Sequence, residues 1–498
     1  MGGGVIVFRK YLEKEIFRKV TIINLLWEKS SLTSLEMSQQ LNVSVSTIKG
    51  DIKAINLQFD ETDPLIESNP TGYLIRNKYK RNKRTYMKKV YQYSPFIKAC
   101  MYFFKTDFSN PLGFAKQEFI SSSKAYQLKK EVMSYVASYS IDLNDKKVED
   151  EYRLRFLIAL FQMKSGIQVV KVSKTSQYKI NHLFQQIEKE QKCLFSDFSK
   201  EYAQILLQLM FDRKMKLKDN LDIKKLEMYK CTPIYHQIED RLVDFLKQMF
   251  LSPDERNLNY CTIVFNFLNQ NFYEINAHEK NYQYYIAFTK KFPVIQYEYL
   301  IDKMERNIPN FSNNQRTIEV LTLMFLRKCH FNFQQLIPEE HVVEGTDMAE
   351  IPQAFFEKIK RIFMDWNDFS GLNLAFSDDH FRYLATKIYF LTYRSKNEKR
   401  VFLLTGVCTD FLWAQEMLEQ EFGNTLDIQQ FNPETIPSNY NKRDVILYNI
   451  SHEKLPQIDC FKMRVSFNFD FCELFNIRKE LFGYDIAMYK KIIEKELR

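Results

Sequence analysis

The spacing of apolar residues near the N-terminus predicts two short helices. Within residues 17–28, apolar side chains recur at helical intervals, at Val20, Ile23, Leu26 and Trp27. A second helix is expected over residues 34–40, with inward-facing positions at Leu35, Ser38 and Leu41. The small side chain of Ser38 suits a point at which two helices cross. Together these segments predict a compact helical unit.

A tight turn at residues 41–43 separates this pair from a predicted third helix, which Ser44 can cap. The apolar residues that would anchor the third helix share one face: Ile48, Ile52 and Ile55. The remaining face carries small hydroxyls, a glycine and lysines: Ser44, Ser46, Thr47, Lys49, Gly50 and Lys53. Such a face can approach a nucleic-acid groove closely, as in a helix-turn-helix recognition helix. We expect Asp51 to lie on the helix surface rather than to contact a base.

Residues 64–75 predict a β-hairpin, because two short apolar segments flank an Asn-Pro-Thr-Gly turn. A helix-turn-helix followed by a hairpin is a winged helix. The segment 76–90 then contains eight Lys or Arg residues and no acid. It can be a solvated linker helix or a patch that neutralises phosphates, and we favour the patch. The phosphate contacts predicted within it are Lys78, Lys80, Arg81, Lys83 and Arg84.

A second copy of this unit is predicted over residues 110–136. At a constant offset of 77 residues, Ala115 replaces Ser38 and Ser121 replaces Ser44. Its exposed face should carry Ser123, Lys124, Gln127 and Lys130. A second wing is expected over residues 141–156, although acidic residues there are unusual for a phosphate contact. The second unit can therefore contact DNA or serve to orient the first.

An internal repeat occupies the middle of the chain. The sequence LMFDRK at residues 209–214 recurs as LMFLRK at residues 323–328. A second ordered match pairs the segment from Ser252 with the segment from Ser377. Two matches in the same order predict tandem homologous helical domains. Neither copy contains a catalytic triad or a phosphate-cradling glycine loop, so we predict no catalytic residue and no enzymatic activity.

Histidines are the candidate functional residues of the two repeats. His380 follows two aspartates at a predicted helix start, where we expect it to be exposed. For any one of the seven histidines, the simpler interpretation is an ordinary surface or packing residue.

The last hundred residues predict a small doubly wound α/β domain. A continuous apolar strand begins at Val401, an amphipathic helix covers residues 411–422, and further strands are expected near residues 425–431, 444–450 and 463–467. Ligands of such domains bind beyond the carboxyl ends of the strands. The candidate residues there are Thr405, Gly406, Val407, Cys408 and Thr409. We expect Cys408 to be inert, because the neighbouring Asp410 would raise the pKa of its thiol.

Composition restricts the function classes. A chain of 498 residues should form about three to five domains. Its net charge of +9 is a mild excess for a protein of this size, so the location of the basic segment matters more than the total. The eight cysteines are scattered without metal-ligand spacing, so no metal or other cofactor is predicted. No apolar run reaches the roughly 18 residues of a membrane helix. We expect a cytoplasmic protein with no membrane partner.

The order of these parts, with "LNVSVSTIKGDIKAIN" and "FISSSKAYQLKK", resembles the Mga/AtxA family of global virulence regulators of Gram-positive bacteria. The resemblance covers the whole chain and implies a mainly helical, multidomain fold. The implied domains are two winged helix-turn-helix domains, two phosphotransferase-system (PTS) regulation domains and an enzyme IIB-like α/β domain, at residues 1–90, 91–170, 171–288, 289–397 and 398–498.

The resemblance also implies a function. Family members regulate transcription by binding double-stranded DNA at promoters, and they form homodimers or higher oligomers. Histidines of the regulation domains can receive phosphate from phosphorylated HPr, and the positions that match here are His380 and His182. Two alternatives remain: an RNA-binding antiterminator, which can carry the same regulation domains, and a phosphocarrier activity of the C-terminal domain.

Overall fold

The structure is a computed structural model of a mainly helical chain. It describes residues 10–482 except 29–30, 60–65, 77–82, 145–147, 214–232, 274–278, 281, 284, 287–288, 290–295, 309–310, 330–332, 339–350, 375, 393–396, 423, 432–443, 451–454 and 456–459. None of the described helices is both long and apolar enough to cross a lipid bilayer.

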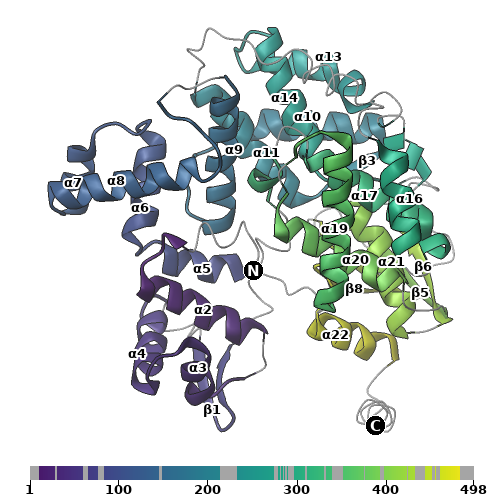
Figure 1. The fold of residues 1–498 in the computed structure, drawn as a ribbon, viewed down its shortest axis with the longest axis horizontal. Coiled ribbons are helices and arrows are strands. Elements are labelled where there is room, and N and C mark those ends of the chain that lie inside the picture. The colour runs from purple at the N-terminus through teal and green to yellow at the C-terminus, as the bar shows by residue number, and fades with distance from the viewer. Residues whose placement is uncertain are drawn as a thin grey trace.

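The first unit is a helix-turn-helix followed by a hairpin, as predicted (Figure 1). Its elements are α2 (Lys14–Glu28), α3 (Ser34–Leu41), α4 (Val45–Asn56), β1 (Ile66–Asn69) and β2 (Gly72–Ile75). Val20, Ile23 and Leu26 of α2 are buried against Ile48 and Ile55 of α4 in a common core. The predicted apolar faces of both helices are therefore confirmed.

The second unit repeats the helices but not the wing. After α5 (Lys83–Tyr91), it consists of α6 (Pro95–Lys105), α7 (Pro111–Glu118) and α8 (Ser122–Ala137). The wing predicted over residues 141–156 is wrong, because the described residues from 148 onward form the helix α9 (Val148–Ser165). Arg153 and Arg155 alternate with apolar residues, as the residues of an exposed strand can. Both arginines are buried, so the alternation does not mark an exposed face.

The helix α9 lies in the interior of the molecule (Figure 1). Nearly all of its residues are buried, and it packs against α5, α11 and η5 (Gln334–Leu336). A helix enclosed on all sides carries apolar residues all round, which explains why its sequence lacks helical amphipathicity. It joins the second unit to the first repeat.

The two repeats present their helices in the same order. The first contains α10 (Lys174–Gln191), α11 (Asp197–Asp212), α13 (Pro233–Gln248) and α14 (Glu255–Phe267), with the short strands β3 (Cys193–Phe195) and β4 (Gln270–Phe272). The second contains α16 (Tyr297–Asn307), η3 (Phe311–Asn314), α17 (Gln315–Cys329), α19 (Gln353–Ser370) and α20 (Asp378–Thr392). The described residues of the first hexamer, 209–213, lie at the end of α11 and directly after it, and the second hexamer lies in the last part of α17. The prediction of a duplicated helical unit stays a prediction.

The C-terminal domain is a parallel α/β sheet. Its strands β5 (Asn397–Leu404), β6 (Asn424–Gln430), β7 (Val445–Tyr448) and β8 (Phe461–Arg464) lie in the order β6-β5-β7-β8. All three strand pairings are parallel. The helix α21 (Cys408–Phe422) follows β5, and α22 (Phe471–Phe482) follows β8. The predicted strand-helix-strand alternation is confirmed for β5, α21 and β6.

The repeats cover the end of this sheet at which ligands of α/β domains usually bind. A Cβ atom at Gly406 would lie only 2.4 Å from the backbone nitrogen of Ser196, at the start of α11. The side-chain amide of Asn271 donates a hydrogen bond to the carbonyl oxygen of Thr405 at 3.3 Å. The C-terminal domain is thus seated on the first repeat through the loop that follows β5.

Candidate nucleic-acid interface

Local capping fixes the turn between α3 and α4. Thr33 and Glu36 form a capping box, in which the Glu36 carboxylate accepts from the Thr33 backbone N–H at 2.7 Å. Asn42 ends α3 in a left-handed conformation, with φ of 51°. Ser44 then caps α4, and its hydroxyl accepts from the backbone N–H of Thr47 at 3.1 Å. The sequence rules for helix ends therefore place the start of α4.

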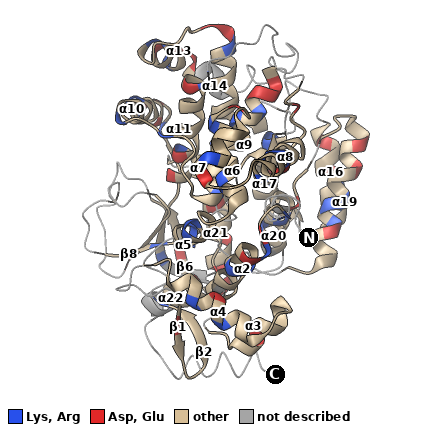
Figure 2. Cartoon of the chain, turned by 90° about the vertical axis from the view of Figure 1, so that its left-hand side faces the viewer, with Lys and Arg blue, Asp and Glu red and all other residues tan. Residues whose placement is uncertain are grey.

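The predicted recognition surface is exposed. Ser44, Ser46, Lys49, Gly50 and Lys53 are exposed, and Thr47 is half-buried. The Ser44 hydroxyl lies 2.8 Å from the hydroxyls of both Ser46 and Thr47. We call these six residues the α4 flank. Figure 2 shows that α3, α4 and the β1–β2 hairpin lie together at one end of the molecule. The flank therefore presents hydroxyls and lysine side chains to the surroundings.

Two predictions about individual side chains of this unit are wrong. Asp51 is buried rather than on the surface, because its carboxylate accepts hydrogen bonds from the Arg18 guanidinium, including one from Nη2 at 3.0 Å. This hydrogen bond raises the pKa of Arg18. The pair ties α2 to α4 and so holds the recognition helix in place. Leu35, expected to face inward, is 57% exposed.

The wing is attached to the helices by backbone hydrogen bonds. Leu32 and Tyr73 exchange backbone hydrogen bonds of 3.0 and 2.7 Å, and the Asn56 side chain pairs with both backbone groups of Ile66. Gly72 has φ of 131°, and a Cβ there would lie 2.5 Å from the Leu32 carbonyl oxygen. Only glycine fits this position, because a side chain would both strain the backbone and collide with it. The wing is thus fixed beside α4.

The basic segment is only partly available for phosphates. Lys78, Lys80 and Arg81 lie outside the described residues. The prediction for Lys83 is wrong, because it is 4% exposed and cannot reach a duplex in this arrangement. Arg84 is also engaged elsewhere, since its guanidinium donates to both carboxylate oxygens of Glu201 on α11, at 2.9 and 2.8 Å. Arg84 instead joins α5 to the first repeat.

Replacing Arg84 by alanine should therefore destabilise the fold without changing the salt dependence of DNA binding. Its guanidinium is already satisfied inside the protein, so no counterion release depends on it. Lys49→Ala is the comparison, and it should reduce the slope of log affinity against log salt by about one. Fluorescence anisotropy over a salt series measures both slopes. An equal loss of slope for Arg84→Ala would show that Arg84 contacts a DNA phosphate in the complex.

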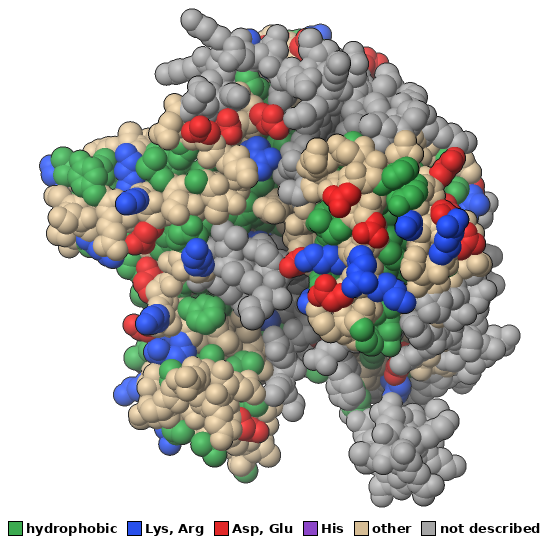
Figure 3. Space-filling view, in the orientation of Figure 1, with side chains coloured by type: hydrophobic (Ala, Val, Ile, Leu, Met, Phe, Trp, Pro, Cys, Tyr) green, Lys and Arg blue, Asp and Glu red, His purple; other side chains and the backbone are tan. Residues whose placement is uncertain are grey.

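The second unit presents a comparable surface. Ser121 caps α8 by accepting from the backbone N–H of Lys124 at 3.2 Å, as Ser44 does in the first unit. The predicted residues Ser123, Lys124, Gln127 and Lys130 are all exposed. Sequence reasoning missed the apolar residues beside them: Phe119 is 96% exposed and Tyr126 is 55% exposed. Figure 3 shows hydrophobic side chains next to basic ones at this tip of the molecule. The constant offset of 77 residues, which aligns Tyr126 with Lys49, could have found this difference.

The histidines predicted for phosphorylation lie in different surroundings. His182 on α10 is half-buried and stacks on Tyr178 with ring centroids 6.4 Å apart. His380 stands in the first turn of α20, as expected, but it is 5% exposed, so the prediction that it is exposed is wrong. The helix α20 that carries it packs against α17, α19 and α21, so it is not a surface helix. The two histidines are not brought together in one site.

Cys408 lies where the sequence placed it, at the start of α21 after β5. It is fully buried, and burial raises the pKa of its thiol to about 12, with Asp410 also acting to raise it and Lys387 to lower it. The prediction of an inert cysteine is consistent with this environment, because the thiolate is the reactive form. Among the described residues, no group of three His, Cys, Asp or Glu side chains could hold a metal ion.

Gly50 offers a test of how closely the flank approaches its target. A Cβ atom at Gly50 would meet no other atom within 4 Å. Gly50→Ala should therefore stabilise the first unit by about 0.5–1 kcal/mol, since glycine is unfavourable within a helix. The added methyl should lower DNA affinity severalfold if the backbone of α4 lies against the groove. Urea unfolding and anisotropy measure the two effects. Increased stability with unchanged affinity would place Gly50 away from the DNA.

A family model matches the first unit of the chain. Residues 13–62 match the model described as the helix-turn-helix domain of the M protein trans-acting positive regulator (MGA). This segment contains α2, α3 and α4, and it includes all six residues of the α4 flank. The match supports an Mga-like regulator family, and it identifies these helices with a DNA-binding domain of transcriptional regulators. Comparison with curated proteins found no match.

Proposed function

We propose that this chain regulates transcription by placing the start of α4 in a major groove of duplex DNA. The observation that carries the proposal is the α4 flank, whose serines and lysines stay exposed while the opposite face forms the core. In helix-turn-helix proteins the N-terminal residues of the second helix contact base edges. Lys49 and Lys53 would contact phosphates or guanine edges, and the hydroxyls of Ser44, Ser46 and Thr47 would donate to or accept from neighbouring groups.

The second unit extends this surface. Lys124 and Lys130 provide positive charge, and Ser123 and Gln127 provide hydrogen-bonding groups at the start of α8. We propose that it contacts the same duplex at a second position. No wing is present in the described residues after α8, so its contribution comes from the helix itself.

A gel shift with the full chain tests the class of nucleic acid. The protein should retard duplex DNA from a random pool more strongly than an RNA hairpin of equal length. An RNA-binding antiterminator would give the reverse order. The helical geometry of the first unit favours DNA, because antiterminators of this type carry a small β-rich RNA-binding module.

We propose homodimerisation as the way in which two copies of the first unit reach one operator. Helix-turn-helix dimers bind half-sites separated by about one helical turn of DNA. Sedimentation of the full chain, with and without duplex DNA, should give a dimer or a higher oligomer. A monomer under both conditions would remove this part of the proposal.

We propose that phosphotransfer from phosphorylated HPr modulates the repeats. A phosphoryl group would pass from the HPr phosphohistidine to an imidazole nitrogen, adding nearly two negative charges. His182 is half-buried on α10, whereas His380 is 5% exposed, so transfer to His380 would require the packing around α20 to open. Labelling of the wild type, His182→Ala and His380→Ala proteins tests this. Equal labelling of all three would exclude both histidines.

A phosphocarrier function of the C-terminal domain is less well supported. Its signature would be an acid-labile phosphate on Cys408. Complete burial of this thiol beneath the repeats opposes the transfer.

A further inference from the structure

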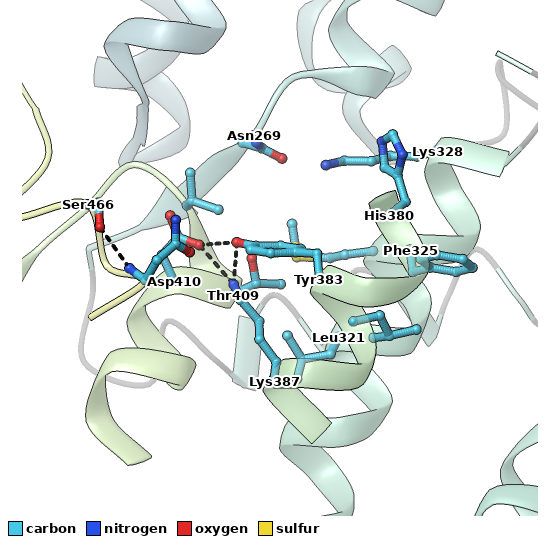
Figure 4. Close-up of a pocket in the computed structure, with 14 residues that line it drawn as sticks. Asn269, Leu321, Phe325, Lys328, His380, Tyr383, Lys387, Thr409, Asp410 and Ser466 are labelled. Atoms are coloured by element: carbon cyan, nitrogen blue, oxygen red, sulfur yellow. Dashed lines mark hydrogen bonds and ion pairs between the residues drawn. The ribbon is translucent and has the colours of Figure 1, made fainter. Parts of the chain in front are cut away.

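A small cavity lies where the second repeat, the first repeat and the C-terminal domain meet (Figure 4). It has a volume of about 40 Å³. Its polar lining comes from α17 and α20, from the loop after α14, and from the loops that follow β5 and β8, with the residues Asn269, Lys328, His380, Lys387, Thr409 and Asn468. A water molecule needs a cavity of roughly 10–15 Å³, so this cavity has room for one small ion. The proposed DNA recognition does not use this cavity, although His380, one of the two proposed phosphorylation sites, lies in its lining.

The described lining of this cavity carries more positive than negative charge. Lys328 and Lys387 are 6% and 1% exposed, and Asp410 is the acidic residue among the described lining residues. The Asp410 carboxylate accepts a hydrogen bond from Lys387 at 2.9 Å and another from the Tyr383 hydroxyl at 2.6 Å. This carboxylate is therefore neutralised by Lys387, and Lys328 adds a further positive charge.

Two buried polar side chains face the cavity without partners of their own. Asn269 is 8% exposed and Thr409 is 6% exposed. Among the described residues, neither the Asn269 amide nor the Thr409 hydroxyl has a hydrogen-bond partner. Buried polar groups are normally hydrogen-bonded, so each points to a group that belongs in the cavity. Figure 4 shows that Asn269 and Lys328 point toward one another across this space.

We propose that the cavity binds a tetrahedral oxyanion of the phosphate type. Lys328 would supply charge, and the Asn269 amide and the Thr409 hydroxyl would donate hydrogen bonds to its oxygens. The helix α21, fifteen residues long, begins at Cys408 beside the cavity, and its N-terminal end favours negative charge. The small volume favours a free ion, because a phosphomonoester carries an organic group that would not fit. A bound oxyanion touches three parts of the chain and so holds the C-terminal domain against both repeats.

Titration of the full chain with inorganic phosphate tests this proposal. Calorimetry should show saturable binding, and the midpoint of thermal unfolding should rise with phosphate concentration. Lys328→Gln should weaken binding about tenfold or more, because it removes a charge-assisted hydrogen bond. Glycerol phosphate should bind much more weakly than phosphate, since its organic part has no room. Stronger binding of glycerol phosphate would overturn the assignment to a free ion.

Further variants separate a specific loss from a failure to fold. Thr409→Val has nearly the same shape as the native residue and should weaken phosphate binding about fivefold. Lys247→Gln removes one exposed lysine from α13, a helix that contributes no described residue to the cavity lining. It should leave phosphate binding unchanged. An identical response of the wild type, Thr409→Val and Lys247→Gln proteins, or no response in any of them, would exclude the site.

Discussion

The double variant Lys49→Glu, Lys53→Glu should bind duplex DNA about 100-fold more weakly than the wild type, or worse, at about 0.1 M salt. Both lysines are exposed on the α4 flank. Each contact of this type contributes about 1–3 kcal/mol, and every 1.4 kcal/mol changes affinity tenfold. Charge reversal also adds repulsion from the phosphates. Fluorescence anisotropy with a duplex selected by the wild-type protein from a random pool measures the change.

A matched control separates this effect from a general loss of positive charge. Lys189→Glu, Lys247→Glu changes the net charge by the same amount on the exposed faces of α10 and α13. It should reduce affinity only slightly, by an amount that salt suppresses. Far-UV circular dichroism should be unchanged in both double variants, because none of the four lysines is buried. Equal losses in the two variants would show that binding depends on overall charge and not on the α4 flank.

Glu151→Gln should lower the free energy of unfolding by about 3–5 kcal/mol, the usual loss when one partner of a buried ion pair is removed. Glu151 is 4% exposed, and its carboxylate accepts from Arg155 Nε at 2.9 Å and from Arg213 Nε at 2.8 Å. Burial acts to lower the pKa of Arg213, but Glu151 and Asp107 together raise it. Arg155 is 1% exposed, so the variant leaves a buried guanidinium without its carboxylate.

The effect should spread beyond one helix, because these residues connect separate parts of the chain. Arg213 follows α11, Glu151 lies on α9, and Arg213 also donates to Asp107 after α6, at 2.8 Å. Urea unfolding followed by circular dichroism measures the loss. Glu190→Gln is the control, because it removes an exposed pair with Arg241 and should hardly move the midpoint. Equal shifts for the two variants would mean that the buried network adds no stability.

Local sequence rules were sufficient for the first unit and for the C-terminal sheet. The turn before α4 follows from Asn42 and Ser44, and the wing follows from the turn that ends at Gly72. Both depend on backbone conformations that particular residues favour. The parallel strands follow from continuous apolar runs such as the one that begins at Val401. A strand needs apolar residues at every position when both faces of its sheet are covered, as in parallel α/β sheets.

The remaining errors come from tertiary partners that no local pattern reveals. Asp51 is buried because Arg18, thirty-three residues earlier, pairs with it. Arg84 is held by Glu201, and His380 is buried on a helix that packs against α17, α19 and α21. From sequence alone, a charged residue in a helix or strand is expected to be exposed to solvent. That expectation fails where an ion-pair partner from a distant part of the chain allows the residue to be buried. For this reason the expected exposure of His380 and the expected phosphate contacts of Lys83 and Arg84 are not what the structure shows.

A chemical nuclease attached to the α4 flank tests the central claim most directly. Ser46→Cys carries the reagent at an exposed position, and Lys247→Cys carries it on α13 as the reference. Bound to the selected duplex, the Ser46→Cys conjugate should cut within a few base pairs of one position in each half-site, and the reference should not. Diffuse cutting, or the same pattern from both conjugates, would contradict the placement of α4 against the groove.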